Sequence, residues 1–147
     1  MKLKRLISVS LAAALLACAL TVPASANTND RDYSFYDIST SSWASTPTAK
    51  KDTASETYVA PSTSPNGTTL VRTYCYVGGS AVNKTTRDTV YLVSGNRYAV
   101  NNYVYEHGDK YDSRVTMWLK MSPQAGRGLL RGKWSPDYTP ESGVIYV

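Results

Sequence analysis

Hydrophobic and polar residues alternate along the second half of the chain. In the clearest run, Val115, Met117, Leu119 and Met121 occupy every second position. Alternation of this kind is typical of a half-buried β-strand, because successive side chains point to opposite faces. Similar runs follow one another with turn residues between them, about ten positions apart. These runs occupy residues 70–77, 88–93, 97–106, 115–121 and 129–134.

The part of the chain before these runs has less to bury. In the segment Ser39–Thr69, 15 of 31 residues are Ser or Thr and three are proline, which is typical of loops. Only Thr57–Val59 within it has the character of a strand. Before it, Tyr33–Ile38 predicts a first strand with Tyr33 and Phe35 on one face. About seven short strands in all predict an all-β fold, either a single antiparallel β-sandwich or a partly open barrel.

The segment Arg97–Glu106 is compatible with two structures. Alternate side chains are apolar, which predicts a strand, and its content of Tyr and Val favours that interpretation. The spacing of Val100, Val104 and His107 before Gly108 instead fits one face of a helix that ends at a glycine. The sequence leaves both open.

The first 26 residues have the pattern of a secretory signal peptide. A cationic start precedes the largely apolar run Leu6–Leu20, and Ala24-Ser25-Ala26 supplies the small residues that signal peptidase requires. The run is shorter than the roughly 20 residues that a membrane span needs. We therefore expect a signal helix cleaved after Ala26, a secreted extracellular product and no transmembrane segment after cleavage. An alternative is lipid anchoring through Cys18, which ends a loose lipobox.

Removal of this leader changes the charge of the protein. Three of the 16 basic residues lie in the leader, whereas all 11 acidic residues follow it, so 13 basic residues remain against 11 acidic ones, a net charge of +2. This weak charge gives no support for a nucleic-acid partner. The expected organisation is a signal peptide (1–26), a first strand with a Ser/Thr/Pro-rich loop region (27–69) and the main part of a single β domain (70–147).

Cysteine and histidine are scarce. Without Cys18 only Cys75 remains, so no internal disulfide can form, and a cysteine-poor exported domain favours a bacterial, Gram-positive source. Cys75 shares a strand face with apolar residues, which predicts a buried and unreactive thiol. A hydrolase in which Cys75 pairs with His107, the only histidine, is the enzymatic alternative. The acidic residues around His107 fit a charged turn better than a metal site, so we assign no catalytic residue, metal or cofactor.

Aromatic and basic residues indicate binding. The 12 Tyr, 3 Trp and one Phe all follow the leader, more than one small core needs. If Met117 and its alternate neighbours face inward, Trp118 and Lys120 face outward, and Arg131 and Lys133 do the same on the last long strand. Pairing of these two strands would create a basic, aromatic surface for an anionic cell-wall or membrane-surface polymer, a glycan or a protein. Burial of Trp118 under a neighbouring element and a merely solvated strand face are the alternatives.

Three segments resemble small secreted proteins of Gram-positive bacteria, a group of unknown function. They are Tyr33-Ser34-Phe35, the stretch from Gly95 to Gly108, which contains Asn102-Tyr103-Val104-Tyr105-Glu106, and Gly132-Lys133-Trp134-Ser135-Pro136-Asp137. The resemblance implies export and a compact β domain, and it carries over no catalytic or binding residues. The function that we expect is therefore a non-enzymatic exported β domain that binds at the cell envelope or extracellularly. A bacteriocin-like antagonist and a secreted hydrolase are the alternatives.

Overall fold

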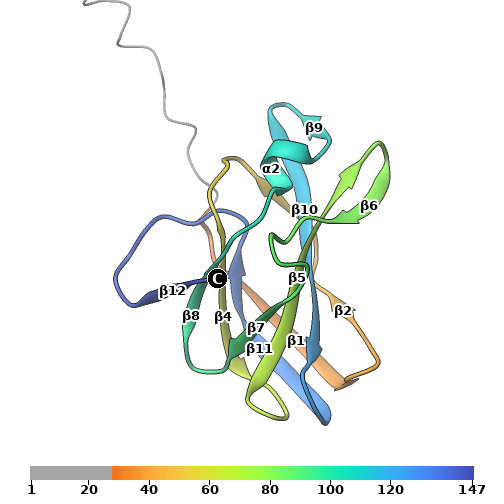
Figure 1. Ribbon diagram of the computed structural model, residues 1–147, viewed down its shortest axis with the longest axis vertical. Helices are drawn as coiled ribbons and strands as arrows, with labels where there is room; N and C mark the ends of the chain where they lie inside the picture. The colour runs from red at the N-terminus through yellow and green to blue at the C-terminus, as the bar shows by residue number, and fades with distance from the viewer. Residues whose placement is uncertain (1–27) are drawn as a thin grey trace, which may run out of the picture.

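The computed structural model describes residues 28–147, so the expected signal helix and Cys18 lie outside the described residues. Two curled, mainly antiparallel sheets pack around one core (Figure 1). Sheet A contains, in spatial order, β1 (Arg31–Ser39), β11 (Arg127–Ser135), β4 (Thr57–Thr63), β8 (Arg97–Val100) and β12 (Val144–Tyr146). Sheet B contains β2 (Ala44–Ser45), β10 (Arg114–Pro123), β5 (Thr68–Val77) and β6 (Ser80–Asn83), with β3 (Ala49–Lys51) and β9 (Lys110–Tyr111) paired to β10 and β7 (Val90–Val93) paired to β5.

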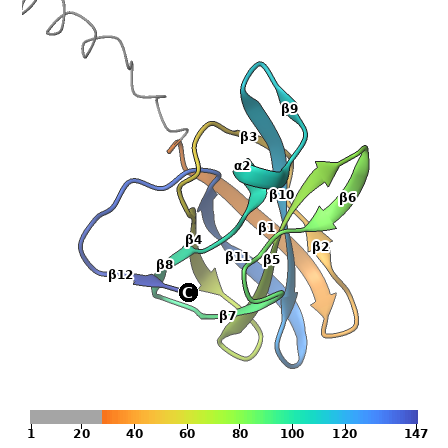
Figure 2. The same cartoon turned by 45° about the horizontal axis from the view of Figure 1, so that its top comes forward.

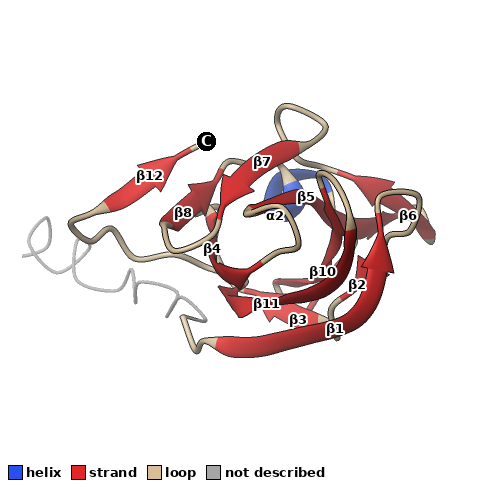
Figure 3. Ribbon diagram, turned by 90° about the horizontal axis from the view of Figure 1, so that it is seen from below, coloured by secondary structure: helices blue, strands red, loops and turns tan. Residues whose placement is uncertain are grey.

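The predicted all-β sandwich or partly open barrel is confirmed. Seen along the strands, the two sheets curl around a common centre (Figure 3). The described residues form twelve strands and one helical turn, α2 (Val104–His107). Several strands have only two to four residues, too few for alternation to be recognised in the sequence. The pairing of β12 with β8 is parallel, and the other pairings are antiparallel.

The longest strands deliver their apolar residues to the core, as the alternation predicts. Met117 and Leu119 of β10 are fully buried, and β10 lies against β5 with Met117 opposite Cys75. From sheet A, Leu130 and Trp134 of β11 enter the same core and are also fully buried. The core therefore lies between β10 and β5 on one side and β11 on the other.

The Ser/Thr-rich segment is more regular than the sequence indicates. It forms β2, β3 and all of β4, which extends from Thr57 to Thr63 rather than ending at Val59. Pro61 lies within β4 where the pairing with β11 shifts register by one residue. Such a bulge accommodates a residue that lacks a backbone N–H. Pairing with long neighbouring strands supplies the order that local composition does not predict.

The segment Arg97–Glu106 contains both of the structures that the sequence left open. Its first part is strand β8, and its last part enters α2, so the preference for a strand throughout is wrong beyond Val100. The helical turn ends at Gly108, whose N–H donates to the carbonyl oxygen of Val104 over 2.8 Å. A Cβ at Gly108 would lie 2.3 Å from Val115, so only glycine lets the turn pack this closely on β10. Together α2 and β9 cover one end of sheet B (Figure 2).

A buried ion pair joins the two sheets. Lys51 of β3 and Asp137, which follows β11, are both fully buried, with Nζ and Oδ1 3.3 Å apart. The Lys51 ammonium also donates to the carbonyl oxygens of Pro136 and Glu56. The Asp137 carboxylate accepts the backbone N–H groups of Asp52 and Thr53 and the hydroxyls of Thr53 and Ser55. Burial lowers the pKa of Lys51, and the charge of Asp137 opposes this effect.

Candidate functional site

The four residues that the sequence indicates for binding lie on two different sheets. Trp118 and Lys120 belong to β10 in sheet B, whereas Arg131 and Lys133 belong to β11 in sheet A. The expectation of one shared surface required these two strands to pair. That requirement is not met, because β10 pairs with β5 and β11 pairs with β1 and β4. The structure therefore has two separate candidate surfaces.

Trp118 lies on the outer side of sheet B but is not exposed. Only 7% of its surface is accessible. Its ring stacks on Tyr74 with the centroids 5.9 Å apart and contacts Tyr76 at 5.0 Å. Lys120 Nζ lies 4.6 Å from the centre of the Tyr74 ring, a cation–π contact. The expectation of an exposed indole is wrong. The two rings that contact Trp118 belong to β5 of the same sheet, not to a second sheet.

The same face continues toward β2 with two cations and a further ring. Arg72 lies directly opposite Lys120 on the neighbouring strand, and its guanidinium is 4.5 Å from the centre of the Trp43 ring. Arg72 also donates to Thr89 and forms an ion pair with Asp88. We call Trp43, Arg72, Tyr74, Tyr76, Trp118 and Lys120 the aromatic ladder. Because its rings and cations engage one another, we assign the ladder to the stability of sheet B rather than to binding.

The outer face of sheet A presents three cations around a shallow depression. Lys133 of β11 lies opposite Ala60 of β4. The pairing of β4 with β8 ends with Val59 opposite Tyr98, and both Ala60 and Arg97, the next residue of each strand, line the depression. The short side chain of Ala60 leaves a hollow of about 330 Å³ between the two cations, and Arg131 completes its rim. We call this depression the basic groove.

The basic groove carries an excess of positive charge that its neighbours reduce but do not remove. Asp32 of β1 lies opposite Lys133, and Glu141 forms a 2.9 Å ion pair with Arg97. Arg131 faces Ser34 and the exposed Tyr36, and hydrogen bonds with Ser34 and Arg131 lower the pKa of Tyr36. The three cations therefore face two carboxylates on this side of sheet A.

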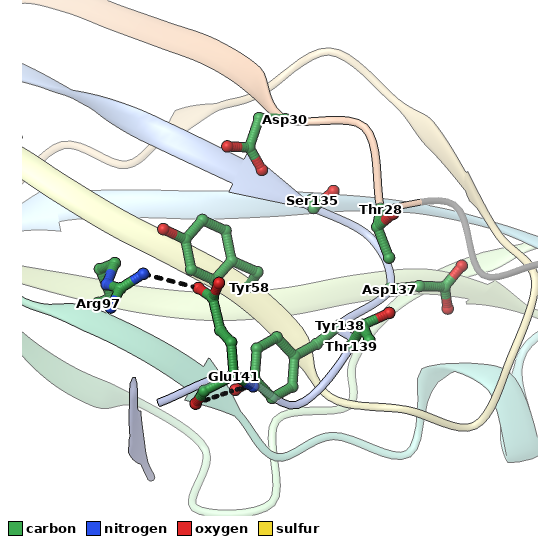
Figure 4. Close-up of a pocket in the computed structure, with 9 residues that line it drawn as sticks. All are labelled: Thr28, Asp30, Tyr58, Arg97, Ser135, Asp137, Tyr138, Thr139 and Glu141. Carbon is green, nitrogen blue, oxygen red and sulfur yellow. Dashed lines mark hydrogen bonds and ion pairs between the residues drawn. The ribbon is translucent and has the colours of Figure 1, made fainter. Parts of the chain in front are cut away.

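A second, polar cavity of about 370 Å³ lies at the end of the groove (Figure 4). Tyr58 of β4 forms its centre and stacks almost parallel on Tyr138, with the ring centroids 6.3 Å apart. The segment after β11 closes one side, because the Tyr138 hydroxyl accepts the backbone N–H of Glu141 over 2.9 Å. The cavity is lined by Thr28, Asp30, Tyr58, Arg97, Ser135, Asp137, Tyr138, Thr139 and Glu141. We call it the polar cavity.

Arg97 is the residue that connects the two depressions. It lines both of them and is fixed by Glu141 and by the carbonyl oxygen of Ser142, which accepts from Nη2 over 2.8 Å. The sequence interpretation missed Arg97 as a binding candidate. Its only local signal is its position next to Tyr98, which is buried, so that Arg97 must face outward on β8.

Comparison with known proteins gives a family and no further relative. The model of a family described as protein of unknown function, DUF2712, matches residues 20–138. This chain belongs to the DUF2712 family. The matched region includes every strand from β1 to β11 and ends at Tyr138, within the lining of the polar cavity. No curated protein and no solved structure matches the chain.

The two candidate catalytic residues of this DUF2712 chain lie on neighbouring elements but differ in exposure. Cys75 is fully buried, and burial raises the pKa of its thiol, so the nucleophilic thiolate is disfavoured. Its sulfur lies beneath α2, 3.2 Å from the position that a Cβ of Gly108 would occupy. The side chain of His107 is exposed and stacks on Tyr103 with the ring centroids 5.5 Å apart. The imidazole thus interacts with a surface ring, while the thiol belongs to the core.

The acidic residues near His107 in this DUF2712 chain shape turns. The carboxylate of Asp109 accepts the backbone N–H groups of Gly78 and Gly79, each over 2.9 Å, and these bonds lower the pKa of Asp109. Asp112 adopts a positive φ of 49° in the turn between β9 and β10. Within residues 28–147, no three His, Cys, Asp or Glu side chains are grouped so that they could hold a metal ion. The described region also has no helix with the length and apolar character needed to cross a bilayer.

Proposed function

We propose that this DUF2712 protein is exported and acts as a non-enzymatic β domain that binds an anionic polymer of a Gram-positive cell envelope through the basic groove. The observation that carries the proposal is the placement of Lys133 and Arg97 on either side of Ala60, with Arg131 beside them. The signal peptide pattern of the first 26 residues supports the export part.

The dimensions of the groove suit a phosphate group. Neighbouring strands lie about 4.8 Å apart, so the backbones of Lys133 and Arg97 are separated by about 10 Å across β4. Lys133 can reach a phosphate from this separation, and Arg97 can add the guanidinium N–H groups that Glu141 and Ser142 do not take. The apolar floor at Ala60 and Pro61 does not compete for these hydrogen bonds. Arg131 is the next cation along β11, where it can meet a second phosphate of the same chain.

A polymer explains how an exposed groove can bind with useful strength. One solvent-exposed ion pair contributes only about 0–1 kcal/mol, so a single free phosphate is held weakly. In a repeating anionic polymer the next group is already close when the first one leaves, which raises its effective concentration. Binding of this kind weakens as salt screens the charges.

Retention of the purified mature protein on isolated cell-wall material tests the proposal. Arg131→Gln/Lys133→Gln should lower the affinity about tenfold, the loss expected for two exposed ionic contacts. Lys110→Gln/Lys120→Gln removes the same charge from sheet B and is the matched control, which should bind like the wild type. Melting curves verify that both variants are folded.

Three results would overturn the proposal. The first is equal loss of retention for the two double variants, which would reduce the effect to net charge. The second is binding to vesicles of anionic lipid that matches or exceeds binding to wall polymer, which would assign the groove to a membrane surface. Retention that does not change between low and high salt would likewise exclude the basic groove as the contact.

A further inference from the structure

The charge along the outer face of sheet A changes sign at Arg97. On one side lie the cations of the basic groove, Lys133 and Arg131. On the other side, the polar cavity contains the carboxylates of Asp30 and of Glu141, the second of which is ion-paired with Arg97. Cations outnumber the one carboxylate, Asp32, around the basic groove, and carboxylates outnumber the one cation, Arg97, around the polar cavity. An anionic group therefore suits the first depression and a cationic group the second.

The polar cavity has the chemistry of a site for a cationic group. Figure 4 shows the Tyr58 ring between Asp30 and Glu141. Burial and then the charges of these two carboxylates raise the pKa of Tyr58, whereas Arg97, the ion-pair partner of Glu141, lowers it. Tyrosine faces attract ammonium groups through their negative quadrupole, and neighbouring carboxylates add to that attraction. Asp137 also lines the cavity, but its carboxylate is bonded to Lys51 and to the backbone of Asp52 and Thr53.

The strand geometry sets the distance between the two charged groups. Tyr58 and Ala60 are alternate residues of β4, so both face outward, and alternate residues are about 7 Å apart along a strand. A cation over Tyr58 and an anion between Lys133 and Arg97 would have this separation. It corresponds to a short linker of a few atoms.

We infer that the two depressions together recognise a zwitterionic group, an ammonium joined by a short linker to a phosphate. The phosphate lies between Lys133 and Arg97, and the ammonium lies in the polar cavity against Tyr58, Asp30 and Glu141. This inference rests on the proposed function and specifies its ligand: the anionic polymer carries amine substituents.

Calorimetric titration of the mature protein with O-phosphoethanolamine tests the inference, with inorganic phosphate and ethanolamine as the two halves of the probe. The intact zwitterion should bind about tenfold more tightly than either half, the gain expected from one cation–π contact and one exposed ion pair. Equal affinities for O-phosphoethanolamine and inorganic phosphate would overturn the inference.

Two aspartates at the start of sheet A provide a matched pair of variants. Asp30→Asn should weaken O-phosphoethanolamine binding about fivefold and leave inorganic phosphate binding unchanged, because it removes one exposed partner of the ammonium. Asp32→Asn removes a carboxylate that faces Lys133, so it should strengthen binding of both probes. Identical effects of the two variants would contradict the assignment of the ammonium to the polar cavity.

Two further comparisons identify the source of the zwitterion and distinguish failure of this inference from failure of the proposed function. Cosedimentation with phosphatidylethanolamine vesicles identifies a lipid headgroup as the source, whereas binding of O-phosphoethanolamine without vesicle binding identifies a polymer substituent. If wall binding depends on Arg131 and Lys133 while the zwitterion binds no better than phosphate, this inference fails and the proposed function stands. If wall binding does not depend on Arg131 and Lys133, the proposed function itself fails.

Discussion

At the residue scale, Tyr33 shows a polar atom in an apolar site. Its side chain is buried, and its hydroxyl has no hydrogen-bond partner among residues 28–147. A buried hydroxyl without a partner lowers the free energy of unfolding, and a phenyl ring of the same shape avoids this loss. Burial also raises the pKa of Tyr33 well above its ordinary value of 10.0.

Tyr33→Phe should therefore keep or raise the stability of the protein and change its response to alkaline pH. We expect a gain of up to about 1 kcal/mol at neutral pH. Because the folded pKa lies above the unfolded one, the folded wild type retains a proton that the unfolded chain loses, so its stability is intact below pH 10 and falls above it. Urea unfolding at pH 8 and pH 10.5 measures this fall, which should be smaller in Tyr33→Phe. An equal fall in the free energy of unfolding between the two pH values in both proteins would contradict the burial of the Tyr33 hydroxyl.

Gly132 of β11 leaves room for the side chain of Tyr33, which lies opposite it on β1. A Cβ at this position would be 2.4 Å from the carbonyl oxygen of Ala60 and 2.6 Å from the Tyr33 hydroxyl. We expect Gly132→Ala to lower the free energy of unfolding by about 3 kcal/mol, because the backbone cannot yield. Gly78→Ala is the control, since its Cβ would meet open space and the cost is only that of its positive φ, about 1 kcal/mol. Chemical denaturation of both variants makes the comparison, and equal losses would exclude a steric role for Gly132.

At the scale of single elements, the aromatic ladder stiffens sheet B from outside. Trp118 contacts Tyr74 and Tyr76, and each aromatic contact adds about 0.5–1.5 kcal/mol beyond the area that it buries. Trp118→Ala should lower stability by about 3 kcal/mol, as aromatic truncations at buried sites do. In the folded state the variant should bind cell-wall material like the wild type. Loss of wall binding with an unchanged melting temperature would show that Trp118 belongs to the surface that contacts the wall.

The ion pair of Lys51 and Asp137 fastens a short edge strand to the far sheet. Removal of one partner from a buried pair is costly, so Lys51→Met should destabilise the protein by about 3 kcal/mol. The adjacent, exposed Lys50 is the control, and Lys50→Met should change stability by less than about 0.5 kcal/mol. Thermal unfolding of the two variants distinguishes them. A small loss for Lys51→Met would mean that the backbone donors alone can hold Asp137.

Elements with strong alternation could be predicted from the sequence, and short elements could not. The inward faces of β10 and β11 follow from the period of two, because each strand is long enough to repeat it. β2 and β9 have two residues each and exist only because β10 offers hydrogen-bonding edges. Burial of Lys51 could not be predicted either, since lysine is almost always exposed unless distant residues supply partners.

At the scale of the whole molecule, strand order decided the candidate site. Alternation tells which residues face inward, but not which strand lies next to which. Arg131 and Lys133 were identified as outward cations, whereas their neighbour Arg97 comes from β8, on the other side of β4. The same limit applies to Trp118 and Lys120, which lie on sheet B and share no surface with Arg131 and Lys133 of sheet A. The basic groove is a property of sheet order, which depends on contacts between residues far apart in the sequence.

Cys75 offers a probe of how the whole fold opens. It is the one free cysteine of the described chain, fully buried opposite Met117 and covered by α2. Reaction with a thiol reagent therefore requires the two sheets to separate or α2 to lift. Because Cys75 belongs to the common core, we expect the first route, with labelling negligible in native buffer and rising with denaturant as steeply as global unfolding does.

The dependence of labelling on denaturant distinguishes the two routes. Global opening exposes the surface of both sheets and gives a steep slope, whereas lifting of the four-residue turn α2 exposes little and gives a shallow one. Labelling of the mature protein at several urea concentrations below the unfolding midpoint measures the slope. Trp134→Ala should accelerate labelling through the global route, because removal of a fully buried indole costs about 3–5 kcal/mol. Rapid labelling of the wild type without denaturant would instead show that α2 is a mobile cover over a reachable thiol.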